Sequence, residues 1–168
     1  MTLSSFVNHP PDVVLYASCT DSPTGKLLFG LTQDGFLCRL SFAEKKGMRS
    51  IVQAWKKEWP TVHFIKSQEE IPFASLKKKK KLLVGTDFQH RVWSALLSIP
   101  AGKTLSYGEM AKKIKKPKAA RAVGNALGKN PVPLLVPCHR VIAAGGKIGG
   151  FSSSLTIKRK LLKREGAL

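Results

Sequence analysis

The feature that most limits how this chain can fold is a set of three prolines, Pro131, Pro133 and Pro137, within seven residues. Each proline fixes its φ angle and lacks a backbone N–H, so this segment cannot continue a helix and does not suit a central strand. Residues 134–136, Leu-Leu-Val, are too apolar to be left in water. The sequence therefore predicts a buried, extended and rigid loop, which delivers the next residue, Cys138, to a fixed position.

Two short helices precede this loop, and a basic turn joins them. Residues 106–114 begin with a serine and a glutamate at capping-box spacing, which predicts a helix. Residues 119–128 are rich in alanine and place Val123 and Leu127 one turn apart, and the glycine and Asn-Pro pair that follow end this second helix. Two short helices across the turn at 115–118 form a helix-turn-helix, whose second helix typically enters a DNA groove.

The N-terminal part of the chain has the pattern of a small sheet with one helix. Residues 13–19, 26–32 and 36–42 are typical of three strands joined by turns, an antiparallel meander. Residues 49–59 place apolar side chains on one helical face and charged side chains on the other, so this helix should cover one side of the sheet. A further strand is expected near residues 62–65. This part of the sequence offers no nucleophile with a base, so its expected role is structural.

The basic run from Lys77 to Lys81 is expected to be an exposed, mobile linker between two domains. The first domain, residues 1–80, is then a structural α/β domain, and the second, residues 81–168, holds the helix-turn-helix and the cysteine. A capping box at Thr86 opens the first helix of the second domain, and a helix over 156–165, with five Lys and Arg outward, ends it. The expected fold class is α+β: a small N-terminal antiparallel sheet with a helix, followed by a mostly helical domain.

The positive charge of the chain lies almost entirely in its C-terminal part. Residues 1–70 contain 8 Lys and Arg against 7 Asp and Glu, whereas residues 71–168 contain 21 against 3, within a net charge of +19. A polyanion, most simply nucleic acid, is the natural partner of such a surface. An anionic membrane would instead favour an amphipathic helix with a broad aromatic-rich face, which the sequence does not show.

The cysteines and the apolar pattern indicate a reducing compartment. Three cysteines, Cys19, Cys38 and Cys138, are too few and too uneven for a disulfide framework. Cys19 and Cys38 lie in apolar, strand-like runs and are expected to be buried small side chains. There is no run of about 18 apolar residues and no secretory pattern at the N-terminus. We therefore expect a cytoplasmic protein associated with DNA and not with a membrane.

Cys138 is followed at once by His139 and Arg140, which suggests chemistry at the thiol. A thiol with a pKa of about 8.5 is mostly protonated at neutral pH, so a reactive cysteine needs a base or a positive environment to become a thiolate. Both neighbours are candidates for that role. Adjacent side chains usually diverge, however, so a bridging water between Cys138 and His139 would be a natural solution.

Three segments together resemble the signature of the O6-alkylguanine-DNA alkyltransferases: RAVG at residues 121–124, NPVP at 130–133 and PCHRV at 137–141. The resemblance extends from about residue 85 to 166, and more weakly to residues 21–26. It implies a DNA repair protein that flips O6-alkylguanine out of duplex DNA and transfers the alkyl group irreversibly to its own cysteine. The implied enzyme is a methylated-DNA-[protein]-cysteine S-methyltransferase, which acts once per molecule as a monomer bound in the minor groove.

The resemblance also implies a role for each matching residue. In the family, a relay runs from glutamate through histidine and a water to cysteine, and the corresponding residues are Glu165, His139 and Cys138. Glu165 would hold His139 in the tautomer that accepts a proton. The backbone around Cys138 and Val141, with Ser152, would read the guanine edge. Asn130 would brace the turn before the cysteine, while Phe151 would line the pocket.

On the DNA side, the resemblance makes Arg121 a finger that intercalates where the flipped nucleotide leaves the stack. Tyr107 would crowd the 3′ phosphate and help to rotate the nucleotide. Three alanines would be small enough to let the second helix lie in the minor groove: Ala119, Ala122 and Ala126.

Two departures from the family pattern bear on substrate range and metal content. Many members have two glycines after the aromatic-serine pair, whereas this chain has Ser153 and Ser154, which could narrow the pocket. Some members bind zinc in the N-terminal domain through two cysteines and two histidines. Thr32, Leu37 and Lys78 stand where three of those ligands would be expected, so no zinc is expected. Thiolate attack on an alkyl carbon is a one-step displacement, so no other cofactor is implied.

Two other functions stay open at this stage. The first is a DNA-binding lesion sensor without transferase activity, as in relatives that lack the cysteine, and Cys138 argues against it. The second is a cysteine hydrolase that uses Cys138, His139 and a carboxylate. Such a hydrolase would turn over small esters or peptides, and it would leave the positive charge of residues 71–168 unexplained.

Overall fold

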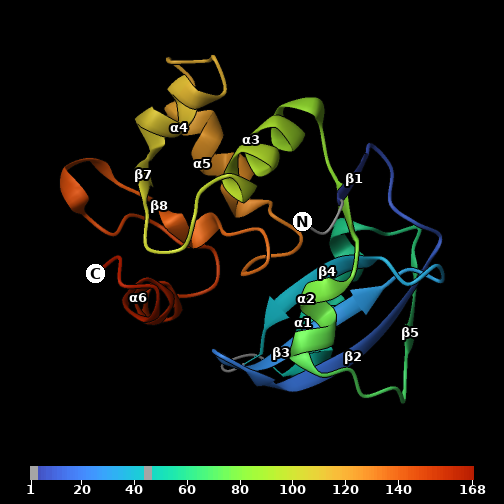
Figure 1. Ribbon diagram of the computed structural model, residues 1–168. Coiled ribbons are helices and arrows are strands. Elements are labelled where there is room, and N and C mark those ends of the chain that lie inside the picture. Colours follow the sequence, from blue (N-terminus) through green and yellow to red (C-terminus); the bar gives the residue numbers. More distant parts are fainter. Residues whose placement is uncertain (1–3, 44–46) are drawn as a thin grey trace. The chain divides into compact units, whose positions relative to one another are not determined.

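The computed structural model describes residues 4–43 and 47–168, and it divides into two compact units (Figure 1). The first unit ends at Gly85 and the second begins at Thr86. Among the described residues, no helix is both long and apolar enough to cross a membrane.

The first unit contains one sheet of six strands in the order β1-β6-β4-β3-β2-β5. The strands are β1 (Ser4–Val7), β2 (Val13–Ser22), β3 (Gly25–Leu31), β4 (Leu37–Phe42), β5 (His63–Lys66) and β6 (Lys81–Val84). The expected antiparallel meander is confirmed, because β2 pairs antiparallel with β3, and β3 with β4. The sheet as a whole is mixed, however. β5 joins β2, and β6 joins β1 and β4, in parallel.

Two helices make the parallel strands possible, since a parallel connection has to cross over the sheet. They are α1 (Met48–Glu58) and α2 (Phe73–Lys78). The apolar face of α1 packs Ile51, Val52 and Trp55 against Leu28 of β3, as the sequence pattern predicts. The short α2 is held at its first turn by Asp21, whose carboxylate accepts the backbone N–H of Phe73.

The expectation of a mobile linker at Lys77 to Lys81 is wrong. Lys77 and Lys78 complete α2, and Lys81 begins β6 with only 5% of its surface exposed. Its ammonium donates to the carbonyls of Lys77 and Lys79, at the negative end of the α2 dipole. A lysine can therefore be buried here, because its apolar stem packs inside while its charge reaches carbonyl oxygens. As a result, β6 belongs to the first sheet, and the two units divide five residues later than expected.

Cys19 and Cys38 are buried in the first unit, as expected, with 3% and 0% of their surfaces exposed. Burial raises the pKa of the Cys19 thiol to about 11 and that of the Cys38 thiol to about 12. The Cys19 thiol donates a hydrogen bond to the Asp21 carboxylate. Both thiols are therefore protonated and structural at neutral pH.

The second unit is mostly helical. It contains α3 (Asp87–Leu97), α4 (Tyr107–Lys113), α5 (Ala120–Gly128) and α6 (Leu155–Arg164), two short 3₁₀ helices, η1 (Cys138–Arg140) and η2 (Ala144–Gly146), and the two-residue strands β7 (Leu105–Ser106) and β8 (Val141–Ile142). Both predicted capping boxes are confirmed, one from Thr86 to Gln89 before α3 and one from Ser106 to Glu109 before α4. Since each box pairs the free N–H groups of a first turn, these helices begin where the sequence predicts.

Helices α3, α4 and α5 enclose the core of the second unit. Trp93 of α3 is fully buried, and its indole N–H donates to the carbonyl of Ala126 in α5 at 2.9 Å. A tight turn joins α4 to α5, with Lys115 in the left-handed conformation at φ 58°. The predicted helix-turn-helix is thus present, and its two helices pack in the core of the second unit.

Candidate active site

The proline-rich loop between α5 and η1 is rigid and largely buried, but it is not extended. Asn130 clamps both ends of it: its carbonyl oxygen accepts the N–H of Val132 at 3.0 Å, and its amide donates to the carbonyl of Val136 at 2.7 Å. Leu134 takes a left-handed conformation, at φ 75°, and reverses the chain so that Pro133 and Val136 form a bridge. The expectation of an extended loop is therefore wrong, because a side-chain clamp folds the segment into turns.

This loop delivers Cys138 to the wall of a cavity of about 170 Å³. The thiol residue is only 4% exposed. Drug-sized ligands occupy larger sites, of ~300 Å³ and above, so this cavity suits a smaller group. Eight described residues line the cavity. Four of them are predicted site residues, namely Tyr107, Cys138, Phe151 and Ser152, and the other four are Leu127, Gly124, Gly128 and Gly150.

The Cys138 thiol is protonated at neutral pH. Burial raises its pKa to about 11, although the Asn130 side chain and the positive charge of Lys158 act in the opposite direction. The thiol is therefore a weak nucleophile by itself, and a base has to remove its proton before it can react.

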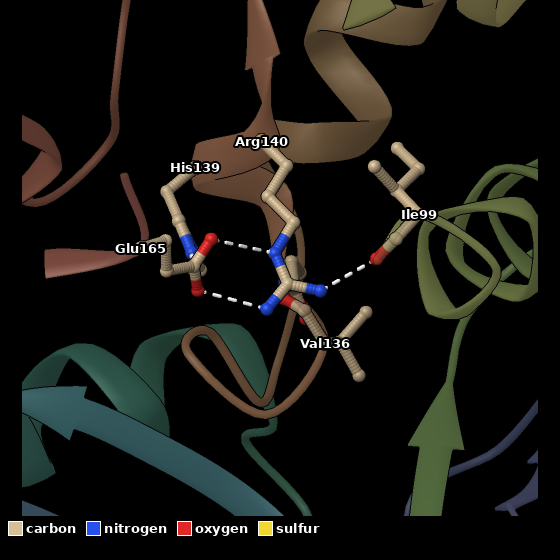
Figure 2. A network of polar contacts seen from close by, with 6 residues as sticks. Ile99, Val136, His139, Arg140 and Glu165 are labelled. Carbon is tan, nitrogen blue, oxygen red and sulfur yellow. Dashed lines mark hydrogen bonds and ion pairs between the residues drawn. The ribbon is translucent and has the colours of Figure 1, made fainter. Parts of the chain in front are cut away.

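Glu165 contacts the adjacent His139, and Figure 2 shows these two side chains next to each other. His139 is fully buried, and its Nε2 lies 3.0 Å from Oε1 of Glu165. The ionised carboxylate accepts the Nε2–H, so the lone pair of the ring lies on Nδ1. Nδ1 is also buried, and it forms no hydrogen bond with a described residue. The arrangement thus presents a proton acceptor inside the protein, beside the cysteine in the chain.

Arg140 points to the other side of the same carboxylate (Figure 2). Its Nε donates to Oε2 of Glu165 at 2.9 Å, its Nη2 donates to Oε1 at 2.8 Å, and its Nη1 donates to the carbonyl of Ile99. The bidentate pair orients Glu165 at the C-terminal end of α6. From the sequence, Arg140 was a candidate source of positive charge beside the thiol. In the structure, its guanidinium instead pairs with the carboxylate of Glu165.

Burial and these hydrogen bonds set the protonation states of His139 and Glu165. Burial lowers the pKa of His139, and the opposing effect of Glu165 does not outweigh it, so the imidazole is neutral at pH 7. Burial alone would raise the pKa of Glu165, but hydrogen bonds from Arg140 and His139 hold it below its usual range. A neutral base beside an ionised carboxylate is the state that can accept a proton from a thiol.

Lys158 is the site residue that the sequence analysis missed. It was counted among five outward cations of the last helix, but it is fully buried, and its ammonium donates to the carbonyls of Val141 at 2.7 Å and Gly150 at 2.9 Å. Burial lowers its pKa to about 8, while the nearby Cys138 raises it. The sequence did contain a sign that Lys158 is buried. Lys158 precedes Leu161 and Leu162 by three and four residues, so it shares their apolar helix face.

A short parallel pairing ties the cysteine segment to the helix-turn-helix. Leu105 and Ser106 of β7 pair with Val141 and Ile142 of β8. Tyr107, the first residue of α4, is thereby placed at the cavity, and its hydroxyl lies 3.5 Å from the carbonyl of Gly150. The predicted residues Tyr107 and Val141 are thus brought to the same end of the site, although only Tyr107 lines the cavity.

The residues expected to face DNA differ in exposure along α5. Arg121 and Ala122 are exposed and Ala119 is partly exposed, so all three are accessible to a ligand on this helix. Ala126 is only 2% exposed and packs inside, where its carbonyl accepts the Trp93 N–H. The Ala126 side chain therefore belongs to the core and is unsuited to the groove contact that was expected of it.

The serines that replace a glycine pair do not line the cavity. Ser154 caps α6, where its hydroxyl accepts the N–H of Thr156 at 3.2 Å. Ser153 is exposed. Neither side chain narrows the cavity in the way the sequence suggested. Within residues 4–43 and 47–168, no group of three or more His, Cys, Asp and Glu is arranged to hold a metal ion.

Comparison with known proteins adds independent findings. Residues 87–167 match the family described as 6-O-methylguanine DNA methyltransferase, DNA binding domain. A methylated-DNA–protein-cysteine methyltransferase of Methanosarcina acetivorans is 41% identical over 156 residues, which cover 91% of this chain and 99% of that protein. A protein of the same name from Mycobacterium tuberculosis is 59% identical over 83 residues, 49% of this chain and 50% of its own length.

Solved structures show the same relationship. A crystal structure of Mycobacterium tuberculosis OGT in complex with DNA superposes with a TM-score of 0.71 at 37% identity, covering 92% of this chain and 94% of that one. The O6-methylguanine-DNA methyltransferase of Pyrococcus kodakaraensis gives a TM-score of 0.66 at 25% identity, covering 91% and 99%. The likeness therefore extends over both units of the chain.

Proposed function

Because the chain belongs to the methylated-DNA–protein-cysteine methyltransferase family, we propose that it repairs DNA by moving the alkyl group of O6-alkylguanine onto Cys138. The observation that carries this proposal is the position of the thiol. Cys138 lies in the wall of a small cavity, next to a neutral histidine that a carboxylate orients. We expect one transfer per molecule.

The proposed reaction is a single displacement. The Cys138 proton passes through a bridging water to Nδ1 of His139, which Glu165 keeps unprotonated and correctly oriented. The thiolate attacks the alkyl carbon, an S–C bond forms, and the C–O6 bond breaks with its electron pair left on the guanine, which takes up a proton. The product is a thioether, which neither His139 nor Glu165 can displace, so the protein is consumed. No step requires a metal or a redox cofactor.

The burial of the thiol supports base flipping. Cys138 is 4% exposed, so a base that stays stacked in a duplex cannot reach it. We propose that the nucleotide rotates into the cavity past Tyr107, while the exposed Arg121 of α5 fills the gap in the stack. The small side chains of Ala119 and Ala122 would let α5 lie in the minor groove of double-stranded DNA.

Inside the cavity, the backbone is proposed to recognise the base. The carbonyls near Cys138 and Val141, with Ser152, would face the guanine edge, and Phe151 would cover a face of the ring. Asn130 keeps the loop before Cys138 in place through its two hydrogen bonds.

We assign different roles to the two units. Residues 86–168 contain the helix-turn-helix, the cavity and the relay, so they would bind DNA and perform the transfer. The first unit contributes packed sheet and helix, and we assign it a structural role. We propose that the protein acts as a monomer in the reducing cytoplasm, where its three free thiols stay reduced.

Mass spectrometry of the protein after incubation with a duplex that contains O6-methylguanine tests this function. The expected result is one added methyl group on Cys138, an equal amount of repaired guanine, and no reaction of the Cys138→Ser variant. Binding without a mass increment would favour the lesion sensor. Release of more repaired DNA than protein present, or turnover of small esters, would overturn the single-transfer mechanism.

A further inference from the structure

Helix α6 carries a row of exposed cations that the proposed transfer does not use. Its inner face buries Ile157, Lys158, Leu161 and Leu162. Its outer face exposes four basic residues, which we call the α6 stripe: Arg159, Lys160, Lys163 and Arg164. With 3.6 residues per turn, these four residues span about 140° of the helix circumference, so they form one continuous surface.

Helix α6 itself supplies no acid to the α6 stripe. Leu155–Arg164 contains no Asp or Glu, and the next residue, Glu165, is already bound by His139 and Arg140. Within the part of the chain that the structure describes, no ion pair reaches Arg159, Lys163 or Arg164. The i,i+4 neighbours on this face carry like charges, which destabilises a helix, whereas soluble surfaces usually mix both signs. A negatively charged partner would remove this repulsion.

The α6 stripe is separate from the basic surface of the helix-turn-helix. That second surface consists of exposed residues around the turn between α4 and α5: Lys112, Lys113, Lys115, Lys116, Lys118 and Arg121. α6 packs against η1, and α5 packs against α3 and α4. In Figure 1, the strands β7 and β8 lie between α6 and the pair α4 and α5. The α6 stripe is therefore not part of the basic surface that lies along the helix-turn-helix (Figure 1).

We propose that the α6 stripe binds the phosphates of a second DNA duplex, so that one molecule bridges two DNA segments. The stripe extends about 7.5 Å along the helix axis, at 1.5 Å per residue. A DNA strand presents a phosphate about every 3.4 Å of its axis, so about two phosphates of one strand fall within reach. The sequence of α6 has no aromatic residue, whereas protein interfaces are enriched in aromatic anchors. These features favour a polyanion over a protein partner.

The test is a bridging assay with two lesion-free duplexes, one biotinylated on beads and one fluorescent, and with protein at a lower concentration than either duplex. The wild type should retain the fluorescent duplex on the beads. The variant R159Q/K160Q/K163Q/R164Q should reduce this retention at least about tenfold, since the contacts to about two phosphates are lost. Its methyl transfer to a short lesion-bearing duplex should stay within about twofold of wild type. That second readout also shows that the variant is folded.

The matched control removes the same charge from exposed lysines of the first unit, in K26Q/K56Q/K57Q/K66Q, and should bridge like the wild type. The proposal needs DNA binding but not alkyl transfer, so Cys138→Ser should bridge as well. Three outcomes would overturn it: no bridging by the wild type, undiminished bridging by the α6 variant, or self-association without DNA that the α6 variant loses. The last outcome would indicate a protein partner instead.

Discussion

Glu165 carries two functions that can be separated by experiment. It accepts from Nε2 of His139, which fixes the tautomer, and it accepts from Arg140 at both oxygens, which fixes the position of the carboxylate. Its charge also raises the pKa of His139 against the larger lowering effect of burial. A change at Glu165 should therefore alter both the rate of transfer and its dependence on pH.

The variant Glu165→Gln should lower the plateau rate of methyl transfer by about tenfold to a hundredfold, since His139 loses its ionised partner. In the wild type, the base is neutral above its lowered pKa, so the rate should fall only at a pH below the ordinary histidine value of 6.5. Without the carboxylate the His139 pKa drops further. The fall in rate at acid pH, the acid limb of the profile, should therefore move to still lower pH.

Single-turnover rates between pH 4.5 and 8.5 measure both effects, and Glu69→Gln, an exposed acid of the first unit, is the control. A lower plateau with an unmoved acid limb would mean that Glu165 acts on folding alone.

Lys158 should make the Cys138 thiol more reactive. Its charge lowers the pKa of that thiol, and its ammonium joins the carbonyls of Val141 and Gly150 around the cavity. Lys158→Met should therefore raise the thiol pKa and slow both methyl transfer and alkylation of Cys138 by iodoacetamide, by about tenfold for each unit of pKa. Lys163→Met, on the exposed face of the same helix, should leave both rates unchanged.

The iodoacetamide reaction, followed by mass spectrometry of the Cys138 peptide, does not depend on DNA. Normal iodoacetamide labelling in Lys158→Met combined with slow methyl transfer would show that Lys158 shapes the base pocket and leaves the thiol pKa alone.

At the level of elements, the sequence predicts best what is decided locally. The capping boxes at Thr86 and Ser106 were predictable because each pairs residues three apart. The pairing of β1 with β6 was not, since it joins Ser4 to Lys81 from opposite ends of the first unit. Short apolar runs carry no sign of a parallel partner so distant in the chain.

The candidate active site shows the same difference between local features, which the sequence predicts, and distant contacts, which it does not. Cys138 and His139 are neighbours in the sequence, and the family resemblance supplies Glu165, whose contact with His139 the structure contains. The turns of the loop depend on the Asn130 clamp, and the position of Lys158 depends on carbonyls of two other segments. Such contacts are set by tertiary packing, which a pattern of charges and prolines does not encode.

Helix α5 should act on the DNA and not on the chemistry. Arg121 is exposed in the first turn of this helix, whereas the hydrogen bonds given for Glu165 join it to His139 and Arg140. Arg121→Ala should slow repair of O6-methylguanine in a duplex by about tenfold or more, because unstacking a base costs a few kcal/mol that an intercalated side chain offsets. Reaction with free O6-benzylguanine, where no stack has to open, should change little.

The measurement compares the two substrates for Arg121→Ala and for Arg91→Ala, an exposed arginine of α3. Equal loss on both substrates would place Arg121 in the chemical step and remove it from base flipping.

On the scale of the whole molecule, charge and function lie in the same part of the chain. Residues 71–168 hold 21 of the basic residues against 3 acids, and the cavity and the helix-turn-helix also lie there. Such an imbalance favours fast, salt-dependent association with DNA that carries little sequence information. Residues 1–70 are nearly neutral and should contribute little to this attraction, whereas Lys77 to Lys81 supply most of the positive charge of the first unit.

This distribution predicts the salt dependence of binding to a short duplex. If about 4–6 Lys and Arg of the second unit contact phosphates, log K should fall against log salt with a slope of about −3.5 to −5.5. Charge reversal of Lys56 and Lys57, on the exposed side of α1, should barely change that slope. Neutralising Lys115, Lys116 and Lys118 beside α5 should flatten it by about one unit for each lost contact. DNA titrations at several salt concentrations measure the slope for all three proteins. A slope that responds to the α1 pair and ignores the turn lysines would place the DNA on the first unit and contradict the proposed binding surface.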